Sequence, residues 1–278
     1  MANILLIGLG DLGSLIAREA MQQGITVYAM RRQSKSPAGV HLIQHDATAP
    51  WPILSDRIAG SAGISDLILC VAPDNRTDDA YRQAYLEIAA QAREWLRQQP
   101  QPVHLWLVSS TSVYGQQQGE WVNEDSPRLP ERGTAKILVK AEDFWLQSGL
   151  PCTMLRPAGL YGPGRDMLLR VARTGQKIVE TQPVYTNRIE ISDCARAIVH
   201  LLLRRQQGRK TASAYNLTDL SSARYRDVIQ FLQQQLDINA TTEQIVQRGS
   251  KRVSARRLQQ TGFNWQYPDF KTGYLSML

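Results

Sequence analysis

The stretch Ile4-Leu5-Leu6-Ile7-Gly8-Leu9-Gly10-Asp11-Leu12-Gly13 decides the fold of this chain. An apolar run leads into three glycines at GxGxxG spacing, and residues 14–21 continue with apolar side chains at helical spacing. A strand, a glycine turn and a helix in this order are typical of a dinucleotide-binding βαβ unit. The glycines allow a tight turn, close approach to a pyrophosphate and close packing of helix on strand.

The helix that follows the glycines begins with free N–H groups and the positive end of its dipole, which favour phosphate. We therefore predict a dinucleotide site formed by Gly8, Gly10, Asp11, Leu12 and Gly13. The alternative is a glycine turn that holds no ligand.

Length and composition indicate a soluble globular protein. The 278 residues suffice for one large α/β domain or for a domain with a smaller lobe. Hydrophobic residues make up 43% of the chain, and the mean hydropathy is -0.32. No apolar run approaches the roughly 20 residues that span a bilayer, and glycines and Asp11 interrupt the N-terminal run, which we interpret as a strand rather than a signal peptide.

The cysteines and the charge narrow the class of protein further. Cys70, Cys152 and Cys194 lie in apolar segments without CxxC spacing, which indicates buried thiols in a reducing compartment and predicts a cytoplasmic location. The net charge of +7 raises nucleic acid as a partner, but the basic residues are spread along the chain, as on solvated helix faces. We predict a small-molecule partner, with no nucleic acid and no membrane. The four histidines lie apart and no G-x-S-x-G occurs, so neither a metal site nor a serine hydrolase is expected.

The second strand, expected over residues 25–30, carries the signal for the cofactor. An NAD-preferring fold usually ends this strand in an acid that binds the ribose hydroxyls, whereas this chain has Met30 followed by Arg31 and Arg32. Two cations favour a 2′-phosphate, and we predict NADP(H) over NAD(H), with a pair of surface arginines as the alternative. Asp46 follows a candidate strand over residues 40–44, where an adenine edge is read.

The remaining segments predict further parallel strands at residues 65–71, 103–108, 152–156 and 214–217. Helices are expected over residues 79–98, 166–173, 193–205 and 225–236. The fourth strand runs into the small-residue turn Val71-Ala72-Pro73, over which a cofactor can pass. The fifth delivers Ser109-Ser110-Thr111-Ser112-Val113-Tyr114-Gly115 at its carboxyl end, where open α/β sheets bind ligands.

Four motifs in fixed order carry a resemblance to a known family. They are residues 8–13, residues 109–115, Arg156-Pro157-Ala158-Gly159-Leu160-Tyr161-Gly162-Pro163-Gly164, and Asn187-Arg188-Ile189-Glu190-Ile191-Ser192-Asp193. Together they resemble the extended short-chain dehydrogenase/reductases of the NAD-dependent epimerase/dehydratase superfamily, and the C-terminal residues 252–269 look like those of its atypical branch. The resemblance covers essentially the whole chain.

The resemblance implies a Rossmann-type, doubly wound, mostly parallel sheet with a small C-terminal substrate lobe. The NAD(P)-binding domain is expected over residues 1–163, completed by about 193–218, and the lobe over 164–192 and 219–278. Further cofactor contacts are implied for Ser109, Pro157 and Gly159. The substrate side is expected to include Tyr114, Tyr161, Arg165, Asn187 and Arg188. In the family, long helices after the fourth and fifth strands form a dimer face, which makes a second copy of the chain a candidate partner.

The family's Tyr-x-x-x-Lys dyad is missing from this chain. Ser110 falls at the family's serine position, with Thr111 beside it. Matching Glu142 to the family's terminal glutamate puts Thr134 at the tyrosine position and Leu138 at the lysine position. Another register gives Lys136 and Lys140, and no tyrosine occurs between Tyr114 and Tyr161.

Three explanations of the missing dyad stay open. The protein uses another acid or base, such as Tyr114, Tyr161, Lys136 or a group of the substrate; it catalyses a slow or different step; or it has kept only binding. With Ser110, Thr111, Thr134 and Lys136 as candidate catalytic residues, we expect NAD(P)-dependent oxidoreductase or epimerase/dehydratase-like chemistry on a small, sugar-nucleotide or phosphorylated substrate. The alternative is a catalytically silent NAD(P)-binding regulatory or structural protein.

Overall fold

The computed structural model describes residues 3–52 and 63–278 and divides the chain into two compact units. Unit 1 comprises Met1–Val113, Pro130–Arg156 and Ala195–Tyr215. Unit 2 comprises Tyr114–Leu129, Pro157–Cys194 and Asn216–Leu278. The division differs from the predicted domain limits chiefly in the segment 114–129, which groups with unit 2.

A seven-stranded sheet with the order β12-β7-β5-β4-β1-β2-β3 forms the centre of unit 1. In that order the strands are Ala214–Leu217, Cys152–Pro157, His104–Val108, Ile64–Leu69, Asn3–Ile7, Thr26–Arg31 and His41–Gln44. The interior strand β1 pairs in parallel with both neighbours, so that Leu5 lies opposite Tyr28 of β2 and Leu67 of β4. The order reverses at β1, as in a doubly wound sheet. The predicted fold class is confirmed.

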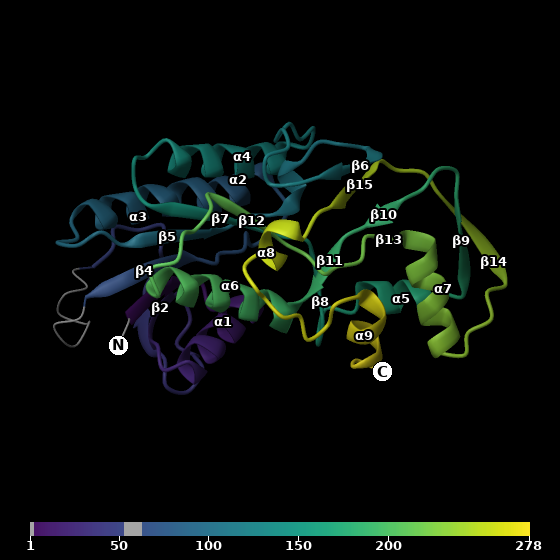
Figure 1. Ribbon diagram of the computed structural model, residues 1–278, viewed down its shortest axis with the longest axis horizontal. Helices are drawn as coiled ribbons and strands as arrows, with labels where there is room; N and C mark the ends of the chain where they lie inside the picture. The colour runs from purple at the N-terminus through teal and green to yellow at the C-terminus, as the bar shows by residue number, and fades with distance from the viewer. Residues whose placement is uncertain (1–2, 53–62) are drawn as a thin grey trace. The chain divides into compact units, whose positions relative to one another are not determined.

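Helices cover both faces of this sheet. Figure 1 shows α1 (Asp11–Gln22) and α6 (Ile191–Gln206) over one face, with α3 (Ile88–Arg97) and α4 (Gly133–Leu146) over the other. The expected helix over residues 79–98 consists of α2 (Asp78–Arg82), the π-helical turn η1 (Gln83–Glu87) and α3. A short 3₁₀ turn, η2 (Thr111–Val113), follows β5.

The sheet of unit 1 holds a charged group in its interior. Asp66 on β4 is fully buried, and its carboxylate accepts hydrogen bonds from Arg205 Nε at 2.8 Å and Nη2 at 2.7 Å. Trp106 Nε1 donates to the same carboxylate at 2.8 Å. A buried charge is tolerated only when it is paired and hydrogen-bonded in this way. The network therefore ties β4, β5 and α6 together in one register.

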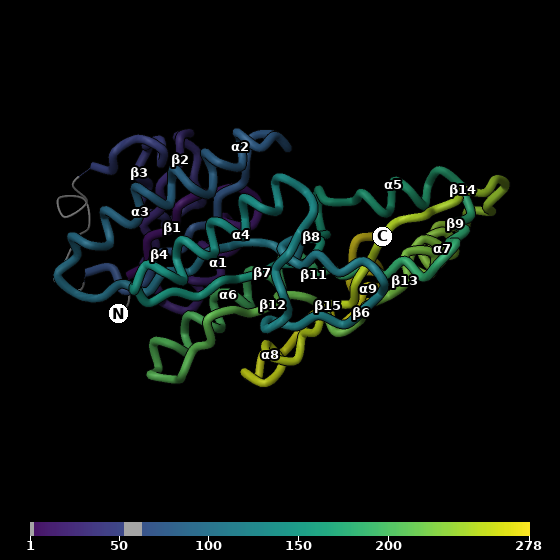
Figure 2. Tube along the Cα trace, turned by 90° about the horizontal axis from the view of Figure 1, so that it is seen from above, coloured from purple at the N-terminus to yellow at the C-terminus, as the bar shows by residue number. Residues whose placement is uncertain are grey.

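Unit 2 consists of short paired strands and small helices. The pairs are β6 (Gln118–Val122) with β15 (Ser250–Val253), β8 (Gly159–Tyr161) with β11 (Arg188–Glu190), β9 (Gln176–Glu180) with β14 (Thr242–Val246), and β10 (Tyr185–Thr186) with β13 (Ala223–Arg224). Its helices are α5 (Met167–Arg173), α7 (Tyr225–Gln235), α8 (Arg256–Gln259) and α9 (Phe270–Leu275). Figures 1 and 2 both show β9 and β14 side by side, next to α7.

An apolar cluster of its own holds unit 2 together. It joins residues of α5, α7 and α9 with Tyr161 of β8 and Ile178 of β9. The rings of Tyr161 and Tyr274 stack with their centroids 4.5 Å apart, and Phe270 meets Phe231 edge to face. Within the described ranges, no helix is long and apolar enough to cross a membrane.

Candidate functional site

The glycine turn after β1 is fixed by two close backbone contacts. Gly8 has φ +97° and donates its N–H to Met30 O at 3.0 Å, and a Cβ on it would lie 2.3 Å from Cys70 O. A Cβ on Gly13 would lie 2.1 Å from Gly8 O. The protein's own backbone therefore leaves no room for a side chain at either position: Gly8 packs against the end of β4, and Gly13 packs against the turn where α1 begins.

The middle glycine is different. A Cβ on Gly10 would meet no atom within 4 Å, and Gly10 caps α1 with an ordinary φ of -72°. Its backbone conformation suits any residue, so neither strain nor packing in the described structure requires a glycine there. What the missing side chain leaves open is space in front of the first turn of α1. Asp11 is exposed and Leu12 buried in that turn, and neither is among the residues that line the cavity described next.

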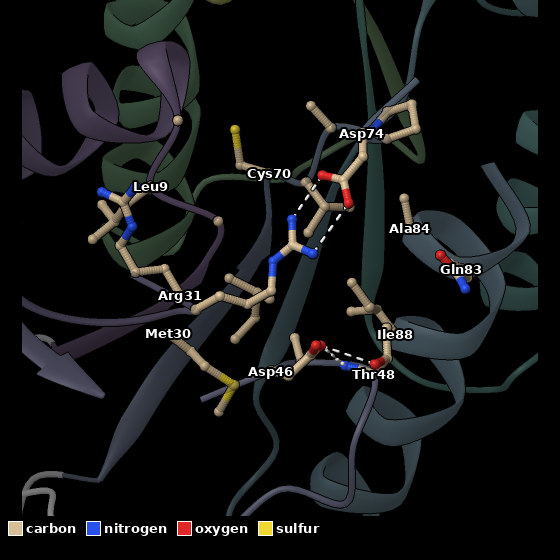
Figure 3. Close-up of a pocket in the computed structure, with 18 of the residues that line it drawn as sticks. Leu9, Met30, Arg31, Asp46, Thr48, Cys70, Asp74, Gln83, Ala84 and Ile88 are labelled. Carbon is tan, nitrogen blue, oxygen red and sulfur yellow. Dashed lines mark hydrogen bonds and ion pairs between the residues drawn. The ribbon is translucent and has the colours of Figure 1, made fainter. Parts of the chain in front are cut away.

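A cavity of about 490 Å³ opens in front of this turn, entirely within unit 1. Its walls come from the carboxyl ends of β1, β2 and β4, from the segment after β3, and from the helix that starts at α2 (Figure 3). The lining residues include Gly8, Leu9, Gly10, Arg31, Arg32, Asp46, Val71, Ala72 and Pro73. Parallel strands with this order bind ligands at their carboxyl ends, where the strand order reverses.

The two arginines at the carboxyl end of β2 line this cavity but have different partners. Arg31 donates to Lys35 O and to Gln33 Oε1, both at 2.6 Å, and so braces the turn that follows the strand. Arg32 forms a two-pronged ion pair with Asp74, with Nη2–Oδ1 at 2.7 Å and Nη1–Oδ2 at 3.1 Å. Figure 3 shows this pair as dashed lines at Asp74. Hydrogen bonding and charge raise the pKa of Arg32 and lower that of Asp74.

Asp46 lies on the same wall, after β3. Its Oδ1 accepts the Thr48 N–H at 3.0 Å and the Thr48 hydroxyl at 2.8 Å, and these bonds lower the pKa of Asp46. The carboxylate is therefore held ionised in a local turn, while its side chain stays exposed at the cavity. An ionised, fixed acceptor suits an amino group such as the one on adenine.

The π-helical turn η1 forms the opposite wall. Gln83, Ala84 and Ile88 face the cavity from this helix, as Figure 3 shows. The buried Tyr85 hydroxyl donates to Val71 O at 3.4 Å, so the same turn also holds the backbone after β4. π-Turns inside helices frequently occur at functional sites. Here two consecutive residues of the turn, Gln83 and Ala84, both line the cavity.

The candidate catalytic residues of unit 1 lie outside this lining. Ser109 is buried at the end of β5, Ser110 Oγ accepts the Ser112 N–H at 3.1 Å, and Thr111 is half-buried in η2. On α4, Thr134 is half-buried and Lys136 is exposed. Leu138, at the family's lysine position, is 3% exposed and belongs to the core.

The glutamate that fixes the register of α4 is buried in unit 1. Glu142 accepts from Arg156 Nε at 3.0 Å and from Nη2 at 2.7 Å, and both side chains are almost fully buried. In the register that matches Glu142 to the family's terminal glutamate, this glutamate therefore belongs to a structural ion pair, and Thr134 and Leu138 stand at the tyrosine and lysine positions.

The two tyrosines offered as substitutes lie in unit 2, and both are buried. Tyr114 Oη donates to Asn216 Oδ1 at 2.7 Å. Burial, followed by the charge of Asp219, raises the pKa of Tyr161 far above its usual value. The family's tyrosine works through a lowered pKa, so Tyr161 has the opposite electrostatics for a proton-transfer role.

The other substrate candidates of unit 2 serve its internal contacts. Asn187 donates to Lys251 O at 2.8 Å and accepts from the Val253 N–H at 2.7 Å, which fixes β15. Arg188 is buried, donates to Thr186 Oγ1 and lies over the Phe270 ring. Two residues predicted to contact the cofactor differ in burial, since Pro157 is buried and Gly159 is exposed. Arg165, predicted on the substrate side, is half-buried.

Sequence reasoning missed several residues of the cavity, among them Asp74, Thr48 and Gln83. A signal for Asp74 existed, because it directly follows the turn after a buried parallel strand. Gln83 gave no such signal, since its position depends on the π-turn. Across residues 3–52 and 63–278, the structure contains no group of three histidine, cysteine or acidic side chains that could hold a metal ion.

The fold and the cavity define a Rossmann-type dinucleotide-binding protein. The model of the NAD-dependent epimerase/dehydratase family matches residues 4–218, and the chain belongs to this family. It is 31% identical to a Methylobacillus flagellatus protein provisionally assigned as an NAD-dependent epimerase/dehydratase, with a TM-score of 0.80 and coverage of 99% of this chain and 97% of that one. The predicted family resemblance is confirmed. A comparison with curated proteins finds no match.

More distant structures share the fold. MoeE5, solved with UDP-glucuronic acid and NAD, is 22% identical with a TM-score of 0.77, covering 99% of this chain and 97% of that one. The human epimerase family protein SDR39U1 (isoform 2), solved with NADPH, is 18% identical with a TM-score of 0.76, covering 98% and 97%. The family implies NAD(P) binding, and the open space at Gly10 fits a pyrophosphate there.

Proposed function

We propose that unit 1 binds NAD(P) in the 490 Å³ cavity and that the protein carries out oxidoreductase or epimerase/dehydratase-type chemistry. The proposed substrate is small, a sugar nucleotide or another phosphorylated compound. One observation carries the proposal: Gly10 is a glycine that no contact within the described structure requires, at the N-terminus of a helix that faces the cavity. A ligand with a phosphate group explains both features.

Each wall of the cavity has a part in the proposed binding. The first turn of α1 would take the pyrophosphate, because its N–H groups and dipole favour an anion. Asp46 would accept a hydrogen bond from the adenine amino group. Arg31 holds its positive charge among neutral partners, which supports a preference for NADP(H) over NAD(H). When bound, the nicotinamide supplies hydride exchange with the substrate.

The proton partner of this hydride exchange is proposed among Thr111 and Lys136. Lys136 is the one cation among the proposed catalytic residues, and it is exposed on α4. The hydroxyl of Thr134 is much less acidic than a phenol, so it cannot replace a tyrosine by simple substitution. Ser110 would orient a substrate oxygen rather than carry the proton.

A catalytically silent NAD(P)-binding protein is the second candidate. Leu138 favours it, because a leucine buried in the core at the lysine position supplies no ammonium. This candidate predicts tight nucleotide binding without turnover of any substrate. The two candidates share the same cavity and differ only in the chemistry beside it.

A titration of the purified protein with NADPH and NADH, followed by nicotinamide fluorescence, tests the shared claim. We expect binding of micromolar strength or better, weakened at least tenfold for NADPH in an Arg31→Ala/Arg32→Ala variant. A control variant, Arg97→Ala, removes one exposed cation from the far end of α3 and should bind like the wild type. If neither nucleotide binds, the proposed site is wrong.

Turnover then separates the two candidates. Sugar nucleotides and phosphorylated carbonyl compounds are added to the nucleotide complex, and absorbance of the reduced nicotinamide and product formation are followed. Turnover that Lys136→Ala abolishes without weakening NADPH binding supports the enzyme and assigns the proton step to Lys136. Turnover that survives in Lys136→Ala moves that step to another residue.

A further inference from the structure

The ion pair of Arg32 and Asp74 connects two edges of the cavity. Arg32 follows β2 and Asp74 follows the turn after β4, 42 residues further along the chain. Both residues line the cavity, and the guanidinium meets the carboxylate with both oxygens engaged (Figure 3). A bidentate pair fixes the direction of both groups as well as their distance.

The pair contributes little to folding. Both side chains are largely exposed, 61% for Arg32 and 64% for Asp74. Ion pairs this exposed add little to the stability of a fold, because water screens the charges and two long side chains lose freedom. A bidentate pair at the edge of a cavity therefore calls for an explanation other than stability.

A comparison with the neighbouring Arg31 shows how Asp74 changes the net charge around Arg32. Among residues 3–52 and 63–278, Arg31 donates to a carbonyl and an amide oxygen, and neither of these partners compensates its charge. Arg32 has Asp74 in contact, and Asp46 adds a second negative charge to its surroundings. Of two adjacent cations, one is left to attract an anion and the other is neutralised.

This difference acts on the two dinucleotides unequally. A ribose 2′-phosphate brings about two negative charges, which gain from a cation with free N–H groups and are repelled by a carboxylate. A ribose 2′-hydroxyl is neutral, and it can donate a hydrogen bond to a carboxylate. Asp74 therefore disfavours the phosphate in two ways and does not disfavour the hydroxyl.

We propose that Asp74 is the specificity-determining residue of the dinucleotide site: it neutralises Arg32 and thereby keeps NAD(H) competitive with NADP(H). The inference rests on the proposed function and deepens it, since it names the residue that opposes Arg31. It also explains how the strand end can lack the usual acid. The acid comes from the turn after β4 instead of from β2.

The test compares the dissociation constants of NADPH and NADH for four proteins: the wild type, Asp74→Asn, Asp74→Asn with Arg32→Ala, and the matched control Asp79→Asn. Asp79 is an exposed acid in the first turn of α2 and does not line the cavity. Asp79→Asn removes the same charge, so it measures the general electrostatic effect. Thermal melting of each variant checks that the fold is kept.

We expect Asp74→Asn to raise the NADPH-over-NADH preference about tenfold, the scale of one charge-assisted hydrogen bond, with NADH affinity changed less than threefold. The added Arg32→Ala should cancel the part of the gain that comes from the freed guanidinium, and Asp79→Asn should leave the preference as in the wild type. If both nucleotides bind but Asp74→Asn shifts the preference no more than Asp79→Asn, the inference is wrong and the proposed function stands. If the wild type binds neither nucleotide, both are wrong.

Discussion

Gly10 and Gly13 lie three residues apart, yet an added methyl group is expected to affect ligand binding at Gly10 and protein stability at Gly13. At Gly10 it enters open space, so Gly10→Ala should change the free energy of unfolding by less than about 1 kcal/mol. Because it occupies the space proposed for the pyrophosphate, NADPH affinity should fall at least tenfold. Denaturant unfolding and a fluorescence titration measure the two effects.

Gly13→Ala is the matched control for this prediction. Its Cβ would lie 2.1 Å from Gly8 O, so α1 must shift and the free energy of unfolding should fall by more than about 2 kcal/mol. Should Gly10→Ala also unfold the protein, or bind NADPH as well as the wild type, Gly10 does not mark the ligand's path.

His104 gives the stability of unit 1 a pH dependence of known sign. Burial lowers the pKa of His104 to about 4, and its Nε2 lies 3.0 Å from Thr153 Oγ1. Between pH 6.5 and 4 the unfolded chain binds a proton that the folded chain does not. The free energy of unfolding therefore falls as the pH falls through this window, by about 2–3 kcal/mol from this residue.

A His104→Gln variant isolates this contribution. Between pH 7.5 and 4.5 its free energy of unfolding should decrease by about 2 kcal/mol less than that of the wild type, since all other titrating groups are common to both. Denaturant unfolding at several pH values measures the two slopes. Parallel slopes would falsify the assignment to His104.

At the scale of single residues, the positions of side chains along the chain were easier to predict from the sequence than their interaction partners. Arg31, Arg32 and Asp46 all line the cavity, because they lie at or just after the carboxyl ends of two strands whose positions the apolar pattern predicts. The partner of Arg32 was not predicted, because an ion pair over 42 residues depends on the turn after β4. Asn187 was likewise interpreted without its bonds to β15.

Among the elements, the helix over residues 79–98 shows where periodicity is sufficient and where it fails. Its buried side chains include Tyr85, Ile88 and Ala92, which recur at helical spacing. The π-turn within it was not predicted, because one extra residue in a turn changes the spacing too little to be seen in a single helix. The two-residue strands of unit 2 were missed for a related reason, since they are too short to show alternation.

Helix α4 allows a prediction about the missing dyad. Leu138 is almost fully buried, so Leu138→Lys places an ammonium in the core and should lower the free energy of unfolding by about 3 kcal/mol or more. Lys136→Ala, on the exposed face of the same helix, should change it by less than about 0.5 kcal/mol. Denaturant unfolding measures both.

This contrast bears on the register of α4. If Leu138→Lys is as stable as the wild type, the lysine position is not part of the core and the dyad could be rebuilt there. A large loss of stability means that this position is needed for core packing. Any ammonium group in the reaction must then come from the exposed face of α4.

For the whole molecule, the chain passes between the two units several times, which limits what sequence can predict. The sheet of unit 1 was predictable because its strands are continuous apolar runs. The assignment of residues 114–129 was not, because it depends on β6 pairing with β15, and these strands are more than 120 residues apart. The cavity proposed to bind NAD(P) is nevertheless lined by unit 1 alone.

That separation leads to a prediction about Tyr274. Its ring is 1% exposed, stacks on Tyr161 and joins the apolar cluster of unit 2. Tyr274→Ala should destabilise unit 2 by about 3–5 kcal/mol, as for other large aromatic truncations. Hydrogen exchange and limited proteolysis should then report faster opening at residues 157–194 and 216–278.

Because every residue that lines the cavity belongs to unit 1, the NADPH dissociation constant should stay within about threefold of the wild-type value. Tyr274→Phe, which keeps the ring, is the control and should open at nearly the wild-type rate. A loss of NADPH binding in step with the opening of unit 2 would show that the cavity depends on both units.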